Sequence, residues 1–233
     1  MTKLLPQNFP PIAPASIASY DFTDIADGTG VRSFYGAVWT SGGADYPPAI
    51  ITSGCFLTGQ ELSSAKIAAS GAIIAGAGQG YINNNNFDIS FSIPQRIKGN
   101  AYLQITLGAY RLSAVGSTPQ IWVSGASLTN VNKSEQLGAN ITSTTLVLPS
   151  VVGVYSKTYN LKFDLSDKIY HFAKGDVLRL NLPLWGTGGS TDALVYGGYG
   201  TDPKARADTG LTISGAYSTQ MVLNLPFDID IGQ

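Results

Sequence analysis

Apolar and polar residues alternate strictly in the segment 171–185, HFAKGDVLRLNLPLW. After a turn at 173–176, every second position is a leucine: Leu178, Leu180, Leu182 and Leu184. Because successive side chains of a strand point to opposite faces, this period of two places the leucines on one core-facing side. The segment 159–165 alternates in the same way, with Tyr159, Leu161, Phe163 and Leu165 in phase. We expect the two segments to be neighbouring strands of an antiparallel sheet.

The same pattern recurs along the chain in about eight to ten short segments separated by Gly, Asn and Ser turns, with almost no helical periodicity. Strands are predicted near 31–39, 49–57, 87–93, 101–112, 119–123, 141–148 and 221–231. Turns are predicted at 83–86 and 98–100, and a surface loop at 129–140. Pro226 predicts an edge or a bulge in the last strand. The predicted fold is all-β: an antiparallel jelly-roll-like β-sandwich with an extended N-terminal arm.

Residues 1–19 are predicted to form the arm, and residues 20–233 a single β-sandwich (jelly-roll) domain. Prolines at positions 6, 10, 11 and 14 favour an extended backbone and interrupt any apolar helix of a signal peptide. The apolar residues of the arm, including Phe9, Ile12 and Ile17, are too many for a solvated tail. We therefore expect the arm to dock on its own domain or on a neighbour, with these three side chains as partner contacts.

Charge and cysteine content exclude several kinds of partner. Charged residues make up 12% of the chain, against about 25% in a typical soluble domain, and the net charge is -1. The 14 Lys and Arg residues are scattered, which argues against a nucleic-acid partner. The sequence has no run of about 18 consecutive apolar residues, so no membrane partner is predicted. With Cys55 as the single cysteine, no intramolecular disulfide or cysteine-based metal cluster is expected, and the predicted place of folding is a reducing cytoplasm.

No set of residues predicts a catalytic, cofactor or metal site. The glycine-rich stretch 76–80 lacks the strand-and-helix setting that a dinucleotide needs, so a flexible loop is favoured. Asp21, Asp24 and Asp27 are three apart without a distal Glu, which favours turn chemistry over a loosely built calcium site. His171 is the single histidine and no G-x-S-x-G motif is present. We expect no catalytic residues, no cofactor and no enzymatic activity.

A glycine-rich excursion of about 25 residues follows Trp185, and loops of this length are usually functional or packed on a partner. Trp185, Tyr196, Tyr199 and Tyr217 gather around it in the sequence. Aromatic side chains beside Asn and Asp can stack on sugar rings, although aromatics that bridge core and loop are the favoured interpretation. Tyr196 and Tyr199 are the predicted partner contacts of this region.

Two stretches resemble a known group of proteins: ASYDFTDIADGTGVRSFYG at 18–36 and YHFAKGDVLRL at 170–180. Together they resemble β-rich virion structural proteins of tailed bacteriophages. The resemblance implies a jelly-roll protein that sits on a capsid as decoration or cement, or in a tail or fibre assembly, and it implies no catalytic motif.

The hypothesis from the sequence is therefore a bacteriophage capsid decoration or cement protein that stabilises the shell through its arm and loops. It would be made in the host cytoplasm and lie on the capsid surface of the virion. Its expected partners are the major capsid protein and copies of itself, as a trimer or dimer. The alternative is a tail-fibre-type receptor- or glycan-binding module that uses Tyr196 and Tyr199.

Overall fold

The computed structural model describes residues 18–19, 29–39, 54–59, 79–111, 118–151, 153–187, 195–199 and 221–228. Every regular element in these ranges is a β-strand, and the all-β sandwich prediction is confirmed. The strands are β1 (Ala18–Ser19), β2 (Thr29–Trp39), β3 (Gly54–Thr58), β4 (Gln79–Ser90), β5 (Gln95–Arg111), β6 (Gln120–Val123), β7 (Ala126–Asn130), β8 (Glu135–Ile141), β9 (Leu146–Val147), β10 (Gly153–Phe172), β11 (Val177–Thr187), β12 (Val195–Tyr199) and β13 (Val222–Asp228). Of the predicted arm at 1–19, residues 1–17 lie outside the described residues, and Ala18–Ser19 form β1.

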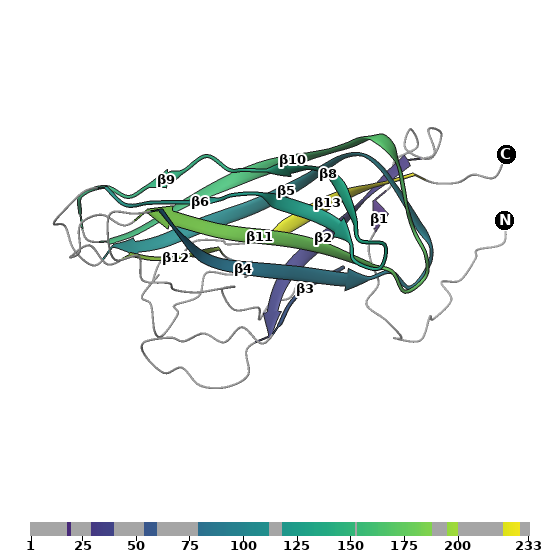
Figure 1. The fold of residues 1–233 in the computed structure, drawn as a ribbon, viewed down its shortest axis with the longest axis horizontal. Helices are drawn as coiled ribbons and strands as arrows, with labels where there is room; N and C mark the ends of the chain where they lie inside the picture. Colours follow the sequence, from purple (N-terminus) through teal and green to yellow (C-terminus); the bar gives the residue numbers. More distant parts are fainter. Residues whose placement is uncertain are drawn as a thin grey trace, which may run out of the picture.

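The strands form one curled sheet that folds into two facing layers (Figure 1). The first layer has the order β10, β5, β13, β2, with β12 continuing beside β5. The second has the order β3, β4, β11, followed by β7 and β6 and then β8 and β9. Pairing of β2 with β3 carries the sheet from one layer to the other. Apart from the parallel pair of β3 and β4, every described pairing is antiparallel.

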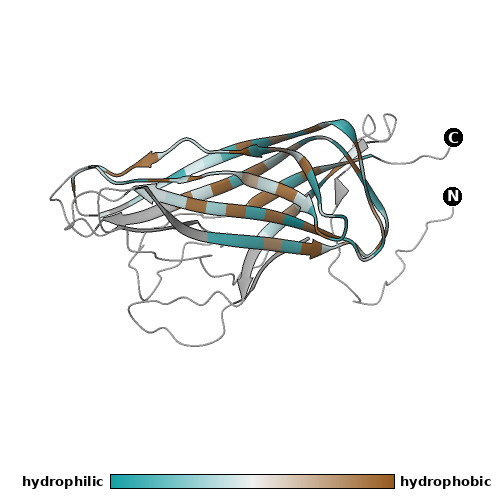
Figure 2. Cartoon of the chain, in the orientation of Figure 1, coloured by the Kyte–Doolittle hydropathy of each residue, from teal (hydrophilic) through white to brown (hydrophobic). Residues whose placement is uncertain are grey.

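The core lies between the layers and contains the residues that the alternation predicted. The four leucines of β11 are fully buried, and the four in-phase residues of β10 are buried as well. The alternation of apolar and polar residues along β11 is visible in Figure 2. Each fully buried side chain of this size contributes roughly 1.5–3 kcal/mol relative to an exposed one. These contacts between layers hold the sandwich together.

One prediction about these two strands is wrong, because β10 and β11 are not neighbours in the sheet. β10 pairs with β5, and β11 pairs with β4 on one side and with β6 and β7 on the other. The turn at 173–176 therefore carries the chain from the first layer to the second (Figure 1). Two amphipathic strands joined by a short turn can meet either edge to edge or face to face. Here their buried sides face each other across the core.

Two predicted turns lie inside strands. The asparagines at 83–86 belong to β4, where Asn86 pairs with Asn181 and Asn85 with Leu182. Asparagine is a poor strand former, but contacts with neighbouring strands commonly override that preference. Residues 98–100 belong to β5, where Gly99 has a φ of +112° opposite an irregularity in the register of β10. The glycine there permits a bulge rather than a reversal of the chain.

Other boundaries were predicted in part. The predicted loop at 129–140 is mostly a hairpin, since β7 ends at Asn130 and β8 begins at Glu135. The predicted strand at 141–148 shortens to β9, whereas the strand at 119–123 is confirmed as β6. The glycine-rich excursion contains the strand β12. The pairing of β13 with β5 is irregular between Asn224 and Phe227, so the bulge predicted from Pro226 is confirmed.

Candidate functional site at the loop-bearing end

Three connections meet at one end of the sandwich: residues 91–94, 131–134 and 173–176. Asp176 joins two of them, because its buried carboxylate accepts hydrogen bonds from the Ala173 amide at 2.9 Å and from Asn130 Nδ2 at 3.2 Å. These donors favour the charged form and hold the pKa of Asp176 below its ordinary value. Gly175 has a φ of +90°, as the turn requires. The prediction that Asp176 serves turn geometry agrees with these contacts.

Hydrogen bonds donated by backbone amides fasten the three connections to one another. The Gly175 amide donates to the Phe91 carbonyl at 2.8 Å, and the Phe91 amide donates to the Asp176 carbonyl at 3.0 Å. The Val177 amide donates to Asn132 Oδ1 at 2.9 Å. This end is therefore a preformed surface rather than a set of separate loops.

The outer surface of this end combines an apolar side chain with cations. Ile93 is 60% exposed, and Pro94, Lys174 and Lys133 are exposed on the same three connections. Lys133 Nζ donates to the carbonyl oxygen of His171 at 2.5 Å. Asp176, the carboxylate of the turn, is turned inward and buried. The exposed side chains of the three connections thus include a large apolar residue, a proline and two lysines. We call Ile93, Pro94, Lys174 and Lys133 the end surface.

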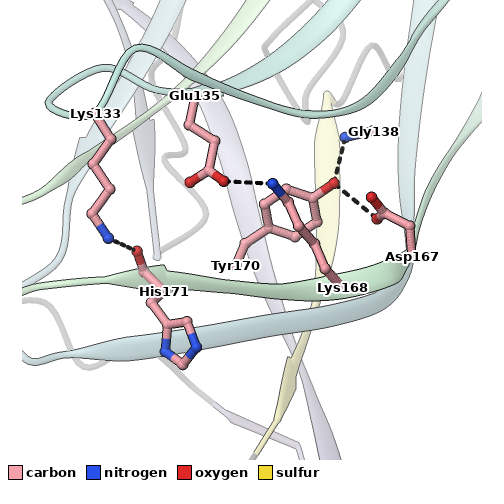
Figure 3. Close-up of polar contacts among 7 residues, drawn as sticks. All are labelled: Lys133, Glu135, Gly138, Asp167, Lys168, Tyr170 and His171. Carbon is pink, nitrogen blue, oxygen red and sulfur yellow. Dashed lines mark hydrogen bonds and ion pairs between the residues drawn. The ribbon is translucent and has the colours of Figure 1, made fainter.

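A second group of polar contacts holds β8 against the end of β10 (Figure 3). The Gly138 amide donates to the Tyr170 hydroxyl at 3.1 Å, and this hydroxyl donates to Asp167 Oδ1 at 2.8 Å. Lys168 Nζ lies 2.8 Å from Glu135 Oε1. Burial, followed by the Asp167 carboxylate, raises the pKa of Tyr170, and the hydrogen bond to Glu135 raises the pKa of Lys168. We call these five residues the clasp, because they join the two layers at an edge without backbone pairing.

The histidine singled out by the sequence lies beside the clasp without joining it. His171 is exposed, and its imidazole is turned away from the carboxylates of the clasp (Figure 3). The hydroxyl of Tyr170 is already bonded to Gly138 and Asp167. These polar groups hold strands together. In the described ranges, no three His, Cys, Asp or Glu side chains are grouped to hold a metal ion.

The outer face of the second layer carries a further arrangement of side chains. Trp122 of β6 and Trp185 of β11 occupy directly paired positions, and both are half-buried. Beside them, Asn181 Nδ2 lies 2.6 Å from Oδ1 of both Asn84 and Asn86. Sequence reasoning missed the tryptophan pair. The period of two already placed Trp185 in phase with the outward residues of β11, but nothing in the sequence supplied Trp122 as its partner.

The predicted contact residues lie largely outside the part of the chain that the structure describes. Phe9, Ile12 and Ile17 lie outside the described residues, as do Asp21, Asp24 and Asp27 and the stretch 76–78. The backbones of Tyr196 and Tyr199 belong to β12, where they pair with Tyr110 and Leu107 of β5 in the first layer. Trp185 lies in the second layer. The backbones of Trp185 and of these two tyrosines thus belong to strands of different layers, and the predicted role of Tyr196 and Tyr199 stays a prediction.

No protein-family model matches the chain, and no curated protein matches it. Two crystal structures of a CocE/NonD family hydrolase from Staphylococcus aureus are similar at 12% identity. One covers 67% of this chain and 34% of the hydrolase at a TM-score of 0.31, and the other covers 84% and 36% at 0.32. A structure of infectious bursal disease virus, Gx strain, is similar at 12% identity over 87% of this chain and 44% of the viral chain, with a TM-score of 0.26. This chain thus spans less than half the length of each of these structures.

The prediction that the chain has no enzymatic activity is corrected by this comparison. Two of the three structures are hydrolases, which contradicts that prediction, and it is withdrawn. TM-scores of 0.31 and 0.32 transfer neither the activity nor the fold of those hydrolases to this chain. Within the described ranges, no helix is long and apolar enough to cross a membrane.

Proposed function

We propose that this protein is a structural component of a virion, namely a decoration or cement protein of a bacteriophage capsid. The observation that carries the proposal is the end surface, which presents an exposed isoleucine on connections already hydrogen-bonded to one another. A surface ordered before binding loses little conformational entropy when it docks, so a small contact can hold firmly. The resemblance of residues 18–36 and 170–180 to phage virion proteins supports the same proposal.

The proposed partner of the end surface is the major capsid protein. Ile93 and Pro94 supply exposed apolar side chains, and Lys174 and Lys133 supply positive charge on the two neighbouring connections. An acidic rim around an apolar pocket on the shell would complement this surface in charge and shape. The same protein also forms a trimer or dimer with its own copies in the proposed assembly.

The proposed arm supplies the second contact. Ala18 and Ser19 pair with Arg32 and Val31 of β2, so the last two residues of the arm are anchored at a strand of the first layer. An arm leaving from this fixed point can reach a neighbouring subunit, with Phe9, Ile12 and Ile17 as anchors. Deleting residues 1–17 keeps β1 and is expected to weaken particle stability while the sandwich keeps its melting temperature. Unchanged particle stability would remove the arm from the proposal.

The proposal is tested by measuring how many copies of the protein a particle carries and by testing whether the end surface binds the particle. On purified particles, a copy number near that of the shell subunit is expected, and a few copies per particle would instead place the protein in a tail. Ile93→Asp is expected to abolish binding to particles that lack the protein. Val151→Asp is the matched control, because Val151 is 61% exposed and precedes β10 at the opposite end of the sandwich. If both variants bind as well as the unaltered protein does, the end surface is not the contact.

A further inference from the structure

The outer face of the second layer carries two tryptophans, which point away from the core. Trp122 and Trp185 are directly paired across β6 and β11, so their Cβ atoms are about 4.5–5.5 Å apart. Their neighbours along the strands, Ile121, Val123 and Leu184, are fully buried on the other face. Both tryptophan side chains therefore point to the outer face of the layer, where each is half-buried.

Amide and hydroxyl side chains flank this aromatic pair along the strands. Gln120 and Thr187 are the next outward residues on β6 and β11 and are themselves directly paired. On the other side of Trp185, Pro183 separates it from Asn181, which contacts Asn84 and Asn86 of β4. Asn86 is exposed, so its amide group can reach a ligand in solvent. The site thus places hydrogen-bond donors and acceptors on both sides of an apolar platform.

The face is close to electrically neutral. The charged residue at an outward position of β11 is Arg179, and its guanidinium is bonded through two nitrogens to the carboxylate of Asp88. β6 has the sequence QIWV and contributes no charge. An anionic ligand would find no unpaired cation on these two strands.

We propose that Trp122 and Trp185, with Gln120, Asn181 and Asn86, form a binding site for a neutral saccharide. The apolar C–H face of a pyranose ring packs on an indole, and its hydroxyl groups bond to the amides. A saccharide is favoured because Gln120 and Thr187 at one end of the aromatic pair, and Asn181 beyond Pro183 at the other, place amide and hydroxyl groups within the same face. The site is independent of the proposed capsid contact, since it lies on a sheet face and not on the end surface. It also differs from the predicted Tyr196 and Tyr199 site.

Binding to a panel of neutral oligosaccharides, consisting of α-glucan, β-glucan, mannan and galactan hexamers, tests the proposal by calorimetric titration and by tryptophan fluorescence. At least one hexamer is expected to bind saturably, with an affinity that is insensitive to salt. Trp122→Ala and Trp185→Ala are each expected to weaken binding about tenfold or more, as loss of a central aromatic contact does. Tyr102→Ala is the matched control: Tyr102 is an aromatic residue with 46% exposure on a strand of the first layer, and its loss should leave binding unchanged.

An alanine variant that does not fold is replaced by the double substitution Trp122→Phe with Trp185→Phe. This variant keeps the aromatic character of both positions and reduces the ring area. It is expected to bind the saccharide more weakly while its melting transition stays intact. Absence of binding to every hexamer would overturn the proposal. So would binding that survives both tryptophan substitutions, or binding lost only on Tyr199→Ala. Particles are not used in this experiment, so its outcome does not depend on the capsid proposal.

Discussion

Arg179 of β11 and Asp88 of β4 stand opposite each other in the sheet and form a two-point ion pair, with Nε–Oδ1 at 2.8 Å and Nη2–Oδ2 at 2.7 Å. About a third of each side chain is exposed, so water screens the attraction. A double-mutant cycle with Arg179→Ala and Asp88→Ala is expected to give a coupling free energy of about 0.5–1 kcal/mol that shrinks in high salt. The more exposed, single-contact pair of Lys168 and Glu135 should give less. A larger coupling for the second pair would contradict this explanation.

Gly138 and Gly175 both have a positive φ, at +66° and +90°, but their surroundings differ. A Cβ at Gly138 would lie 2.6 Å from the carbonyl oxygen of Asp164, whereas a Cβ at Gly175 would meet nothing within 4 Å. Gly175→Ala should therefore cost about 1 kcal/mol of backbone strain. Gly138→Ala should cost about 3 kcal/mol, because β8 must also move away from β10. Urea denaturation measures both, and equal losses would show that the close approach of the strands is unimportant.

Tyr170→Phe removes the hydroxyl that joins Gly138 to Asp167. The expected loss is about 1–2 kcal/mol, because the Gly138 amide is left without its acceptor. Burial raises the pKa of Tyr170, so the neutral phenol contributes stability below about pH 10 that is lost as the pH rises through the higher folded-state pKa. The stability difference between the unaltered protein and the variant should thus shrink at alkaline pH. A difference that stays constant up to pH 12 would rule out this role for the hydroxyl.

Asp176→Asn tests the acid side of the pH range. Hydrogen bonds from the Ala173 amide and then from Asn130 hold the pKa of Asp176 below its ordinary value. The charged carboxylate therefore contributes stability above about pH 4, and this contribution is lost as the pH falls through the lower folded-state pKa. The melting temperature of the unaltered protein should exceed that of the variant at neutral pH, with a gap that closes in acid. Asn130→Ala should close part of the same gap at neutral pH, and a pH-independent gap would contradict the assignment.

The sequence predicted which side chains are buried far better than which strands are neighbours. Alternation fixes the face of each residue, so the leucines of β11 and the in-phase residues of β10 were assigned to the core correctly. Alternation does not specify a hydrogen-bonding partner, however. Partners of β11 come from β4, at Asp88, and from β6, at Trp122, both far away along the chain. A short turn between two amphipathic strands gave no information about these distant partners.

The candidate surfaces were harder to predict than the fold because they depend on those pairings. The exposure of Ile93 follows from where three connections meet, and the tryptophan pair follows from the register of β6 against β11. Asparagine content suggested a turn at 83–86, but contacts of Asn84 and Asn86 with Asn181 stabilise a strand there. Propensity describes one residue at a time, whereas these features belong to pairs of residues on different strands.

The position of β13 has a consequence for how the chain reaches its folded state. Leu223 lies between Leu103 of β5 and Phe34 of β2, so the strand that comes last among those described fills the middle of the first layer. While residues 222–228 of a growing chain are still inside the ribosome, both β5 and β2 have open edges. Strands of other molecules can add to these edges. Correct assembly of this layer therefore has to wait until every other described strand has been synthesised. Incomplete chains would be the aggregation-prone species, and full-length ones are expected to become protease-resistant only after β13 is inserted.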